Sequence, residues 1–137
     1  MKRFTIILLL LLTLSPICAQ QYKDGGELVK DMYNCEPEVT LNRLQKSGYD
    51  YSKITEGTYR NQDIWIVGDQ SAKSFFVDKK SLLFIRMQDK LGRSVDFLDY
   101  QLFNNKPVDT HILFYNKLGK LYMEEIFNPG NFVQSRW

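Results

Sequence analysis

The stretch after Tyr51 constrains the fold most, because it carries more apolar β-forming sequence than the rest of the chain can cover. Short segments rich in Ile, Val, Phe, Tyr and Trp alternate there with short polar breaks, a pattern typical of strands and turns. Breaks this short fit hairpins and leave no room for the crossovers that parallel strands need. The sequence therefore predicts an antiparallel meander of about seven strands, at 52–59, 63–68, 73–78, 82–88, 94–103, 109–116 and 121–127.

A short amphipathic helix is predicted before the strands, over residues 26–34. Leu28 and Met32 stand four residues apart, which places them on one apolar helix face. Pro37 is predicted to end this helix, because the residue before a proline is pushed away from helical backbone angles. The stretch 40–46 fits a helical turn but is too short to decide, and its structure stays open.

One short helix cannot cover a sheet of seven strands. Full burial of one Phe or Leu side chain contributes about 1.5–3 kcal/mol, so leaving several of them in water would remove much of a typical stability of about 5–15 kcal/mol. The sheet must therefore curl on itself, stack against another surface or bury its apolar face with a ligand. We predict a mostly β, α+β fold: a single domain over residues 20–137 with a curved antiparallel sheet, an incomplete barrel.

Residues 1–19 have the three parts of a secretory signal peptide. Lys2 and Arg3 form the positive start, an apolar run follows, and a cleavage site is expected after Ala19. The apolar run is shorter than the roughly 20 residues of a membrane-spanning helix. We therefore expect a periplasmic or secreted protein with no transmembrane segment once the signal is removed.

Cys18 supports an alternative, in which the chain is a lipoprotein anchored through an acylated Cys18. Bulky Ile17 precedes this cysteine, where the lipoprotein peptidase requires a small residue, so simple secretion is favoured. Cleavage after Ala19 would leave Cys35 as the single mature cysteine, which excludes an intramolecular disulfide.

The charge balance argues against nucleic acid as a partner. The chain has 18 Lys and Arg against 16 Asp and Glu. Lys2 and Arg3 account for the difference and belong to the predicted signal peptide. Removing them leaves 16 positive against 16 negative residues (18 − 2 = 16), which is not the basic surface that binds phosphate backbones.

No pattern for catalysis or metal binding is present, so we expect neither an enzyme nor a cofactor. His111 is the only histidine, which excludes a site with several histidine ligands. A nucleophilic pair of Cys35 and His111 would describe an exported thiol enzyme, but nothing in the sequence brings the two together. Asp96 and Asp99 stand three apart on a predicted strand and so point to opposite faces. Arg86 is open to two roles, a charge at the rim of a cavity or a pair with an acid on the next strand.

The aromatic residues of the strands have two interpretations. They form either an ordinary core with cross-strand pairs or the lining of a cavity for an apolar guest. The set consists of Trp65, Phe75, Phe76, Phe84, Phe97, Tyr100, Phe103, Phe114, Tyr115, Tyr122 and Phe127.

Three stretches resemble a known family. Residues 74–86, SFFVDKKSLLFIR, look like a recurrent hairpin of the periplasmic lipoprotein-carrier (LolA/LolB-like) superfamily. Residues 63–68 and 96–100 are similar to its preceding and following strands, so the resemblance covers roughly 51–127. It implies an incomplete antiparallel barrel whose concave face, covered by helices, holds the acyl chains of a lipoprotein. The predicted helix at 26–34 would then lie across the mouth of the barrel.

Two functions follow as hypotheses. In the first, the chain is a periplasmic binding or carrier protein for a lipid, an acyl chain or a lipoprotein, and the candidate lining residues are Trp65, Phe76, Phe84 and Phe114. In the second, it is a secreted interaction or structural module with a filled core, which works through an edge strand or an exposed aromatic patch. The oligomeric state and the identity of any ligand stay open.

Overall fold

The computed structural model describes residues 21–32 and 36–128. The predicted signal peptide, Cys18 and Cys35 lie outside the described residues. No helix in the described part of the chain is both long enough and apolar enough to span a bilayer.

Two helices of the described residues precede the sheet, α2 (Gly25–Asp31) and α3 (Pro37–Lys46). Asp24 caps α2 by accepting a hydrogen bond from the Glu27 backbone at 2.9 Å. The prediction that Pro37 ends a helix was wrong in part, because Pro37 stands in the first turn of α3, where a proline leaves no donor unpaired. The stretch left open at 40–46 thus belongs to a second helix.

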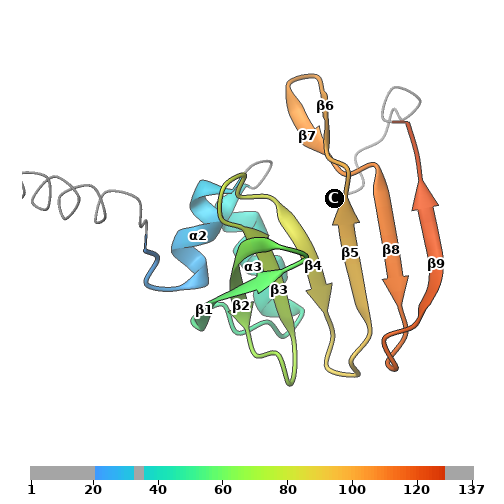
Figure 1. Ribbon diagram of the computed structural model, residues 1–137. Coiled ribbons are helices and arrows are strands. Elements are labelled where there is room, and N and C mark those ends of the chain that lie inside the picture. The colour runs from blue at the N-terminus through green and yellow to red at the C-terminus, as the bar shows by residue number, and fades with distance from the viewer. Residues whose placement is uncertain (1–20, 33–35, 129–137) are drawn as a thin grey trace, which may run out of the picture.

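Nine strands follow between residues 54 and 126, and seven of them form one antiparallel sheet in the order β1-β2-β3-β4-β5-β8-β9 (Figure 1). β6 and β7 form a separate hairpin, and β1 and β9 end the sheet without pairing to each other. The predicted mostly β, α+β fold with a curved antiparallel meander is confirmed, and the sheet is not closed into a barrel. The strands are β1 (Ile54–Tyr59), β2 (Gln62–Gly68), β3 (Ser74–Asp78), β4 (Phe84–Gln88), β5 (Ser94–Leu98), β6 (Gln101–Phe103), β7 (Lys106–Val108), β8 (His111–Tyr115) and β9 (Leu121–Ile126).

The single strand predicted at 94–103 is two strands in the structure. Asp99 adopts a φ of 53°, in the left-handed region, and ends β5 there. The chain then forms the β6–β7 hairpin, whose turn residues Asn104 and Asn105 also have positive φ. Asparagine tolerates this region better than most residues, which explains a tight turn at this point.

An irregularity between Phe76 and Val77 changes which side chains of β4 share a face. Val77 pairs with Phe84, whereas Phe75 pairs with Met87, so one extra residue of β4 is accommodated between the two pairs. Phe84 and Met87 therefore both face the helices, and Ile85 packs on the other side of the sheet. Strict alternation would have placed Phe84 together with Arg86.

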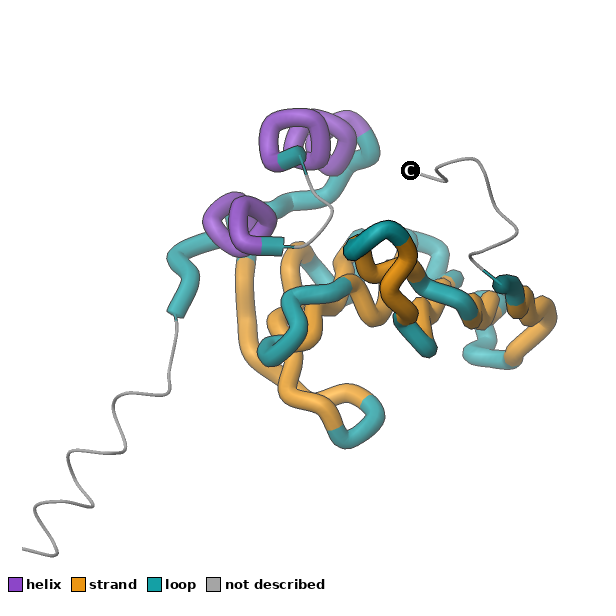
Figure 2. Tube along the Cα trace, turned by 90° about the horizontal axis from the view of Figure 1, so that it is seen from above, coloured by secondary structure: helices purple, strands orange, loops and turns teal. Residues whose placement is uncertain are grey.

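Both helices pack against one face of the sheet, over β2 and β3 (Figure 2). Leu28 and Val29 of α2 and Leu44 of α3 are buried there. They share a core with the strand residues Trp65, Val67, Phe75 and Val77. This is the helix-bearing face.

The opposite face has a smaller core and is covered by the sheet itself. Ile64, Ile66, Phe76 and Ile85 pack there, with Tyr59 partly buried against them. Four strands separate β1 from β8, so in a flat sheet the two would lie roughly 24 Å apart at about 4.8 Å per strand. Yet Arg60, directly after β1, hydrogen-bonds Tyr115 at the end of β8 at 2.7 Å. The sheet therefore curls so that the turn after β1 lies over this face.

Candidate functional site

One row of apolar residues crosses the helix-bearing face from edge to edge. Residues that pair across neighbouring strands share a face, and the pairing links one apolar residue from each of the seven strands. We call this set the apolar row: Ile54, Val67, Phe75, Met87, Val95, Phe114 and Met123.

The helices cover only part of the apolar row. Val67 and Phe75 are fully buried beneath them. The row continues from Met87, which is half-buried at the border of this core, through Val95 and Phe114, which are also half-buried, to Met123, which is 42% exposed. We call these four residues the open half of the row. Figures 1 and 2 show β5, β8 and β9 standing clear of α2 and α3.

A second pair on the same face flanks the open half. Phe97 of β5 pairs with Ile112 of β8, and both are buried, with 8% and 7% exposed. The surface beside the helices thus combines buried and half-buried apolar side chains from three adjacent strands. Such a surface can hold an apolar guest, and Glu125 of β9, which pairs with Ile112, borders it with a charged group.

Trp65 and Phe84, two of the predicted lining residues, belong to the core under the helices. Trp65 is 6% exposed and makes an edge contact with Tyr22, with ring centroids 5.5 Å apart. The Lys79 ammonium lies 4.4 Å above its ring. Phe84 is half-buried and stacks at a tilt on Phe75, at 5.2 Å. Trp65 is therefore a core residue, and Phe84 lies at the border of the open half.

Phe114 and Phe76, the other two, lie on different faces. Phe114 belongs to the open half, and its ring is 6.4 Å from that of Tyr122. Phe76 lies on the opposite face, 8% exposed, with its ring 5.4 Å from Tyr59. The structure thus brings three predicted residues to one face and separates Phe76 from them. Whether any of them lines a guest stays a prediction.

Sequence reasoning missed Met87, Val95 and Met123 of the open half. In strands rich in aromatic residues, neither a methionine nor a single valine is distinguished by its residue type as a candidate lining residue. The signal that unites them is the pairing register, because Met87 pairs with Val95 and Phe114 pairs with Met123. A register cannot be obtained from single-strand alternation alone.

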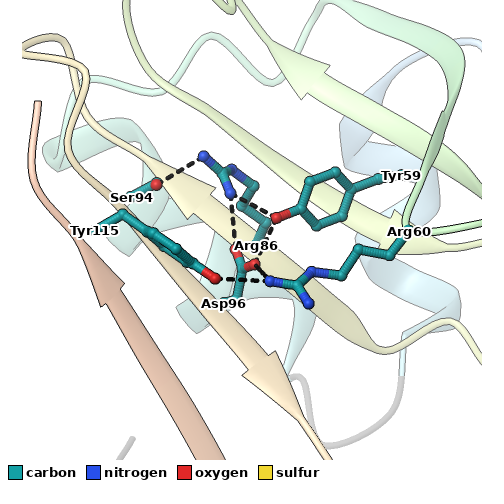
Figure 3. A network of polar contacts seen from close by, with 6 residues as sticks. All are labelled: Tyr59, Arg60, Arg86, Ser94, Asp96 and Tyr115. Atoms are coloured by element: carbon teal, nitrogen blue, oxygen red, sulfur yellow. Dashed lines mark hydrogen bonds and ion pairs between the residues drawn. The ribbon is translucent and has the colours of Figure 1, made fainter. Parts of the chain in front are cut away.

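A buried carboxylate holds the curl on the opposite face (Figure 3). Asp96 of β5 is fully buried and accepts hydrogen bonds from the Arg86 and Arg60 guanidiniums, both at 3.0 Å. The Tyr59 hydroxyl donates to the same carboxylate at 2.5 Å. Arg86 therefore pairs with an acid on the next strand, one of the two roles that the sequence left open. We call Tyr59, Arg60, Arg86, Ser94, Asp96 and Tyr115 the polar clamp.

The clamp ties the first turn of the sheet to two distant strands. Arg86 donates further to Tyr59 at 2.6 Å and to Ser94 at 2.7 Å, while Arg60 reaches Tyr115. Burial and the bond to Asp96 raise the pKa of Tyr59, so its hydroxyl stays protonated and donates. The buried carboxylate is thus held entirely by donors from this chain, an arrangement that suits a structural clamp.

Arg60 occupies a strained position in the clamp. Arg60 and Asn61 have φ of 50° and 62°, the signature of a tight two-residue hairpin turn that usually carries Asn-Gly. A non-glycine residue there costs about 1 kcal/mol. The contacts of the Arg60 side chain with Asp96 and Tyr115 offset this cost.

His111 joins β8 to β9 at the far edge of the sheet. Its two ring nitrogens lie 2.5 Å from Glu124 and 3.2 Å from Asp99. The bond to Glu124, then that to Asp99, raises the pKa of His111, which favours the charged imidazolium. The described residues include no group of three or more His, Cys, Asp or Glu side chains that could hold a metal ion. Cys35, the predicted alternative nucleophile, lies outside them.

Comparisons of the chain with models of protein families, with curated protein sequences and with solved structures find no match. The resemblance to the lipoprotein carriers therefore stays a prediction. The apolar row and its partial cover by the helices are the features of the described residues that point to a function.

Proposed function

We propose that this protein is an exported, periplasmic binding protein that holds an acyl chain or a similar extended apolar guest, carried by a lipid or a lipoprotein. The guest lies along the open half of the apolar row, beside α3. The predicted signal peptide and the resemblance to lipoprotein carriers support this proposal. The proposal restricts the guest site of the first hypothesis from the whole sheet to the open half of the apolar row.

The main observation behind the proposal is that the helices cover only one part of the continuous apolar row. A chain that only needed a core would gain nothing from extending the row across strands that its helices do not reach. Met87 and Met123 lie three strand spacings apart, about 14 Å. An extended acyl chain fits such a strip, and each methylene removed from water contributes about 0.8 kcal/mol.

The opposite face is a poorer place for a guest. Its apolar side chains already pack against one another, and the clamp places two guanidiniums and a carboxylate beside them. An acyl chain there would have to displace buried, hydrogen-bonded groups, at a cost of about 1–3 kcal/mol for each one left unsatisfied. Binding on the helix-bearing face avoids that cost.

The test is displacement of a fluorescent fatty acid from the purified protein by unlabelled fatty acids. Phe114→Ser removes the largest side chain of the open half and should weaken probe binding about tenfold. Leu118→Ser is the matched control, because Leu118 is 74% exposed in the turn between β8 and β9 and should leave binding unchanged. Circular dichroism of both variants checks that they are folded.

Three results would overturn the proposal: no probe binding, equal loss in both variants, or binding that unlabelled fatty acid does not displace. They would favour the second hypothesis, a module with a filled core. Mass spectrometry of lipids that co-purify from the native host would identify the guest.

A further inference from the structure

β9 lies at an open edge of the sheet and exposes several apolar side chains. All six of its residues are exposed. Leu121, Tyr122, Met123 and Ile126 are exposed by 49%, 60%, 42% and 73%. Soluble proteins normally protect an edge strand with charges, irregularities or covers, because an open edge pairs readily with other strands.

The other edge of the same sheet shows that protection. The apolar side chains of β1, Ile54 and Tyr59, pack against the two cores. Its exposed positions are polar, and Glu56 forms a 2.9 Å ion pair with Lys79 of the loop after β3. The two edges of the seven-stranded sheet therefore differ, and of these two only β9 combines a free strand edge with several exposed apolar side chains.

The backbone of β9 presents hydrogen-bonding groups to the open side. The Phe127 amide donates to the Thr110 carbonyl at 3.0 Å, directly after the paired residues of β8 and β9. Hydrogen-bonded pairs alternate along an antiparallel ladder. The amides and carbonyls of Glu124 and Ile126 must then point away from β8, where an added strand would bind them.

The two glutamates of β9 determine which residues a partner strand needs in order to pair with it. Glu124 and Glu125 are adjacent and point to opposite faces, and Glu124 also contacts His111. Glu125 is exposed and pairs in register with apolar Ile112. A lysine or arginine opposite these glutamates stabilises a strand pair, whereas a like charge destabilises it. A second copy of β9 would bring two further glutamates to the same short edge.

We propose that β9 binds an extended segment of a partner protein by strand addition, and that this segment carries basic residues flanked by apolar ones. The backbone of Glu124 and Ile126 provides the hydrogen bonds, and Leu121, Tyr122 and Met123 provide apolar contacts. This interaction shares Met123 with the proposed guest surface but otherwise uses the backbone edge of the sheet rather than its helix-bearing face.

The probe is a synthetic peptide, Thr-Val-Lys-Lys-Val-Val-Thr, N-methylated at alternate amides so that it has one free edge and cannot assemble with itself. The comparison peptide has Glu in place of both lysines. Binding is measured by fluorescence anisotropy of labelled peptides and by amide hydrogen exchange of the full mature chain. We expect the lysine peptide to bind about tenfold tighter and to slow exchange at Glu124 and Ile126.

Glu125→Lys should abolish or reverse this preference. Glu38→Lys is the matched control, because it makes the same change of net charge at an exposed site on α3 and should keep the preference. Equal binding of both peptides, or equal effects of both variants, would overturn the charge selectivity. No binding of either peptide to the folded monomer would overturn strand addition.

Two further outcomes would name a different occupant. Self-association in sedimentation velocity, lost in Ile126→Pro, which removes an amide that faces the open side, would assign the edge to a second copy and overturn the proposal. Slow exchange at Glu124 and Ile126 in the monomer without peptide would mean that another segment of the chain already occupies the edge, which would also overturn it.

Discussion

Replacing Asp96 by asparagine tests the polar clamp with almost no change of shape. The carboxylate is fully buried, and it accepts hydrogen bonds from Tyr59, Arg60 and Arg86. Asparagine removes the charge and turns one acceptor into a donor. That donor faces other donors at 2.5–3.0 Å, and the Arg86 side chain, only 19% exposed, loses its counter-charge.

The structure sets the size of the expected loss. Breaking a buried ion pair by removing one partner costs about 3–5 kcal/mol. Asparagine keeps part of the hydrogen bonding, so we expect Asp96→Asn to lower the free energy of unfolding by about 3 kcal/mol. Arg60 contributes far less, because its side chain is 43% exposed and an exposed pair contributes about 0–1 kcal/mol. Arg60→Ala, which leaves the positive φ equally strained, should therefore cost at most about 1 kcal/mol.

Equilibrium unfolding in urea, followed by tryptophan fluorescence and circular dichroism, measures both variants. We expect a large loss of unfolding free energy for Asp96→Asn and a small one for Arg60→Ala, with unchanged dependence on urea concentration. A loss below about 1 kcal/mol for Asp96→Asn would refute the claim that the carboxylate is buried among its partners. Equal losses in the two variants would refute the division between the buried and the exposed arginine.

Two more predictions concern the sheet. Gly68→Ala should destabilise the protein by more than Gly119→Ala in urea unfolding, because both glycines have positive φ but a Cβ at Gly68 would lie 2.4 Å from the Lys73 carbonyl oxygen and one at Gly119 meets nothing within 4 Å. A similar loss of unfolding free energy in both variants would show that backbone strain alone accounts for the loss. His111 has a pKa above its usual 6.5, so the stability from its charged form is full below pH 6.5 and is lost as the pH rises through the raised value. The unfolding free energy of the wild type should fall toward that of His111→Gln as the pH rises above 6.5, and a difference that does not change with pH would contradict this.

The strands could be predicted because their alternation and their breaks are local features. Every strand of the large sheet overlaps a predicted segment, since apolar β-branched and aromatic runs are interrupted by turn residues such as Asp89 and Gly92. Asp89 accepts hydrogen bonds from the backbones of Leu91 and Arg93, the local chemistry that makes aspartate a turn residue. The antiparallel meander then follows from the short connections.

The second helix and the β6–β7 hairpin could not be predicted with the same means. Pro37 is compatible with the end of one helix and with the start of another, and only packing decides between them. In β5 the apolar pattern continues past Leu98, but the chain leaves the sheet at Asp99 through a positive φ. Nothing in the residue types on either side marks that change of backbone conformation.

The polar clamp could not be predicted from the sequence for a different reason. The pair of Arg86 and Asp96 follows from one hairpin register, and the sequence did leave such a pair open for Arg86. Tyr59 and Arg60 reach Asp96 only because the sheet curls. The degree of curl depends on packing over the whole sheet and not on any local pattern.

The clamp and the apolar row are linked through β5. Asp96 and Ser94 belong to the clamp on one face, and Val95 and Phe97 lie on the other, so a slip of β5 by one residue would exchange the two sets. Such a slip would bury Val95 in place of the carboxylate and leave Arg86 unpaired, at a cost of about 3–5 kcal/mol. The buried ion pair thus contributes to specificity, because it fixes the register that places Val95 between Met87 and Phe114. The combined Arg86→Met and Asp96→Leu replacement should therefore keep the unfolding free energy within about 1–2 kcal/mol of the wild type, yet show additional amide resonances for β5 in NMR spectra. A single, unchanged set of resonances would mean that the turns alone determine the register.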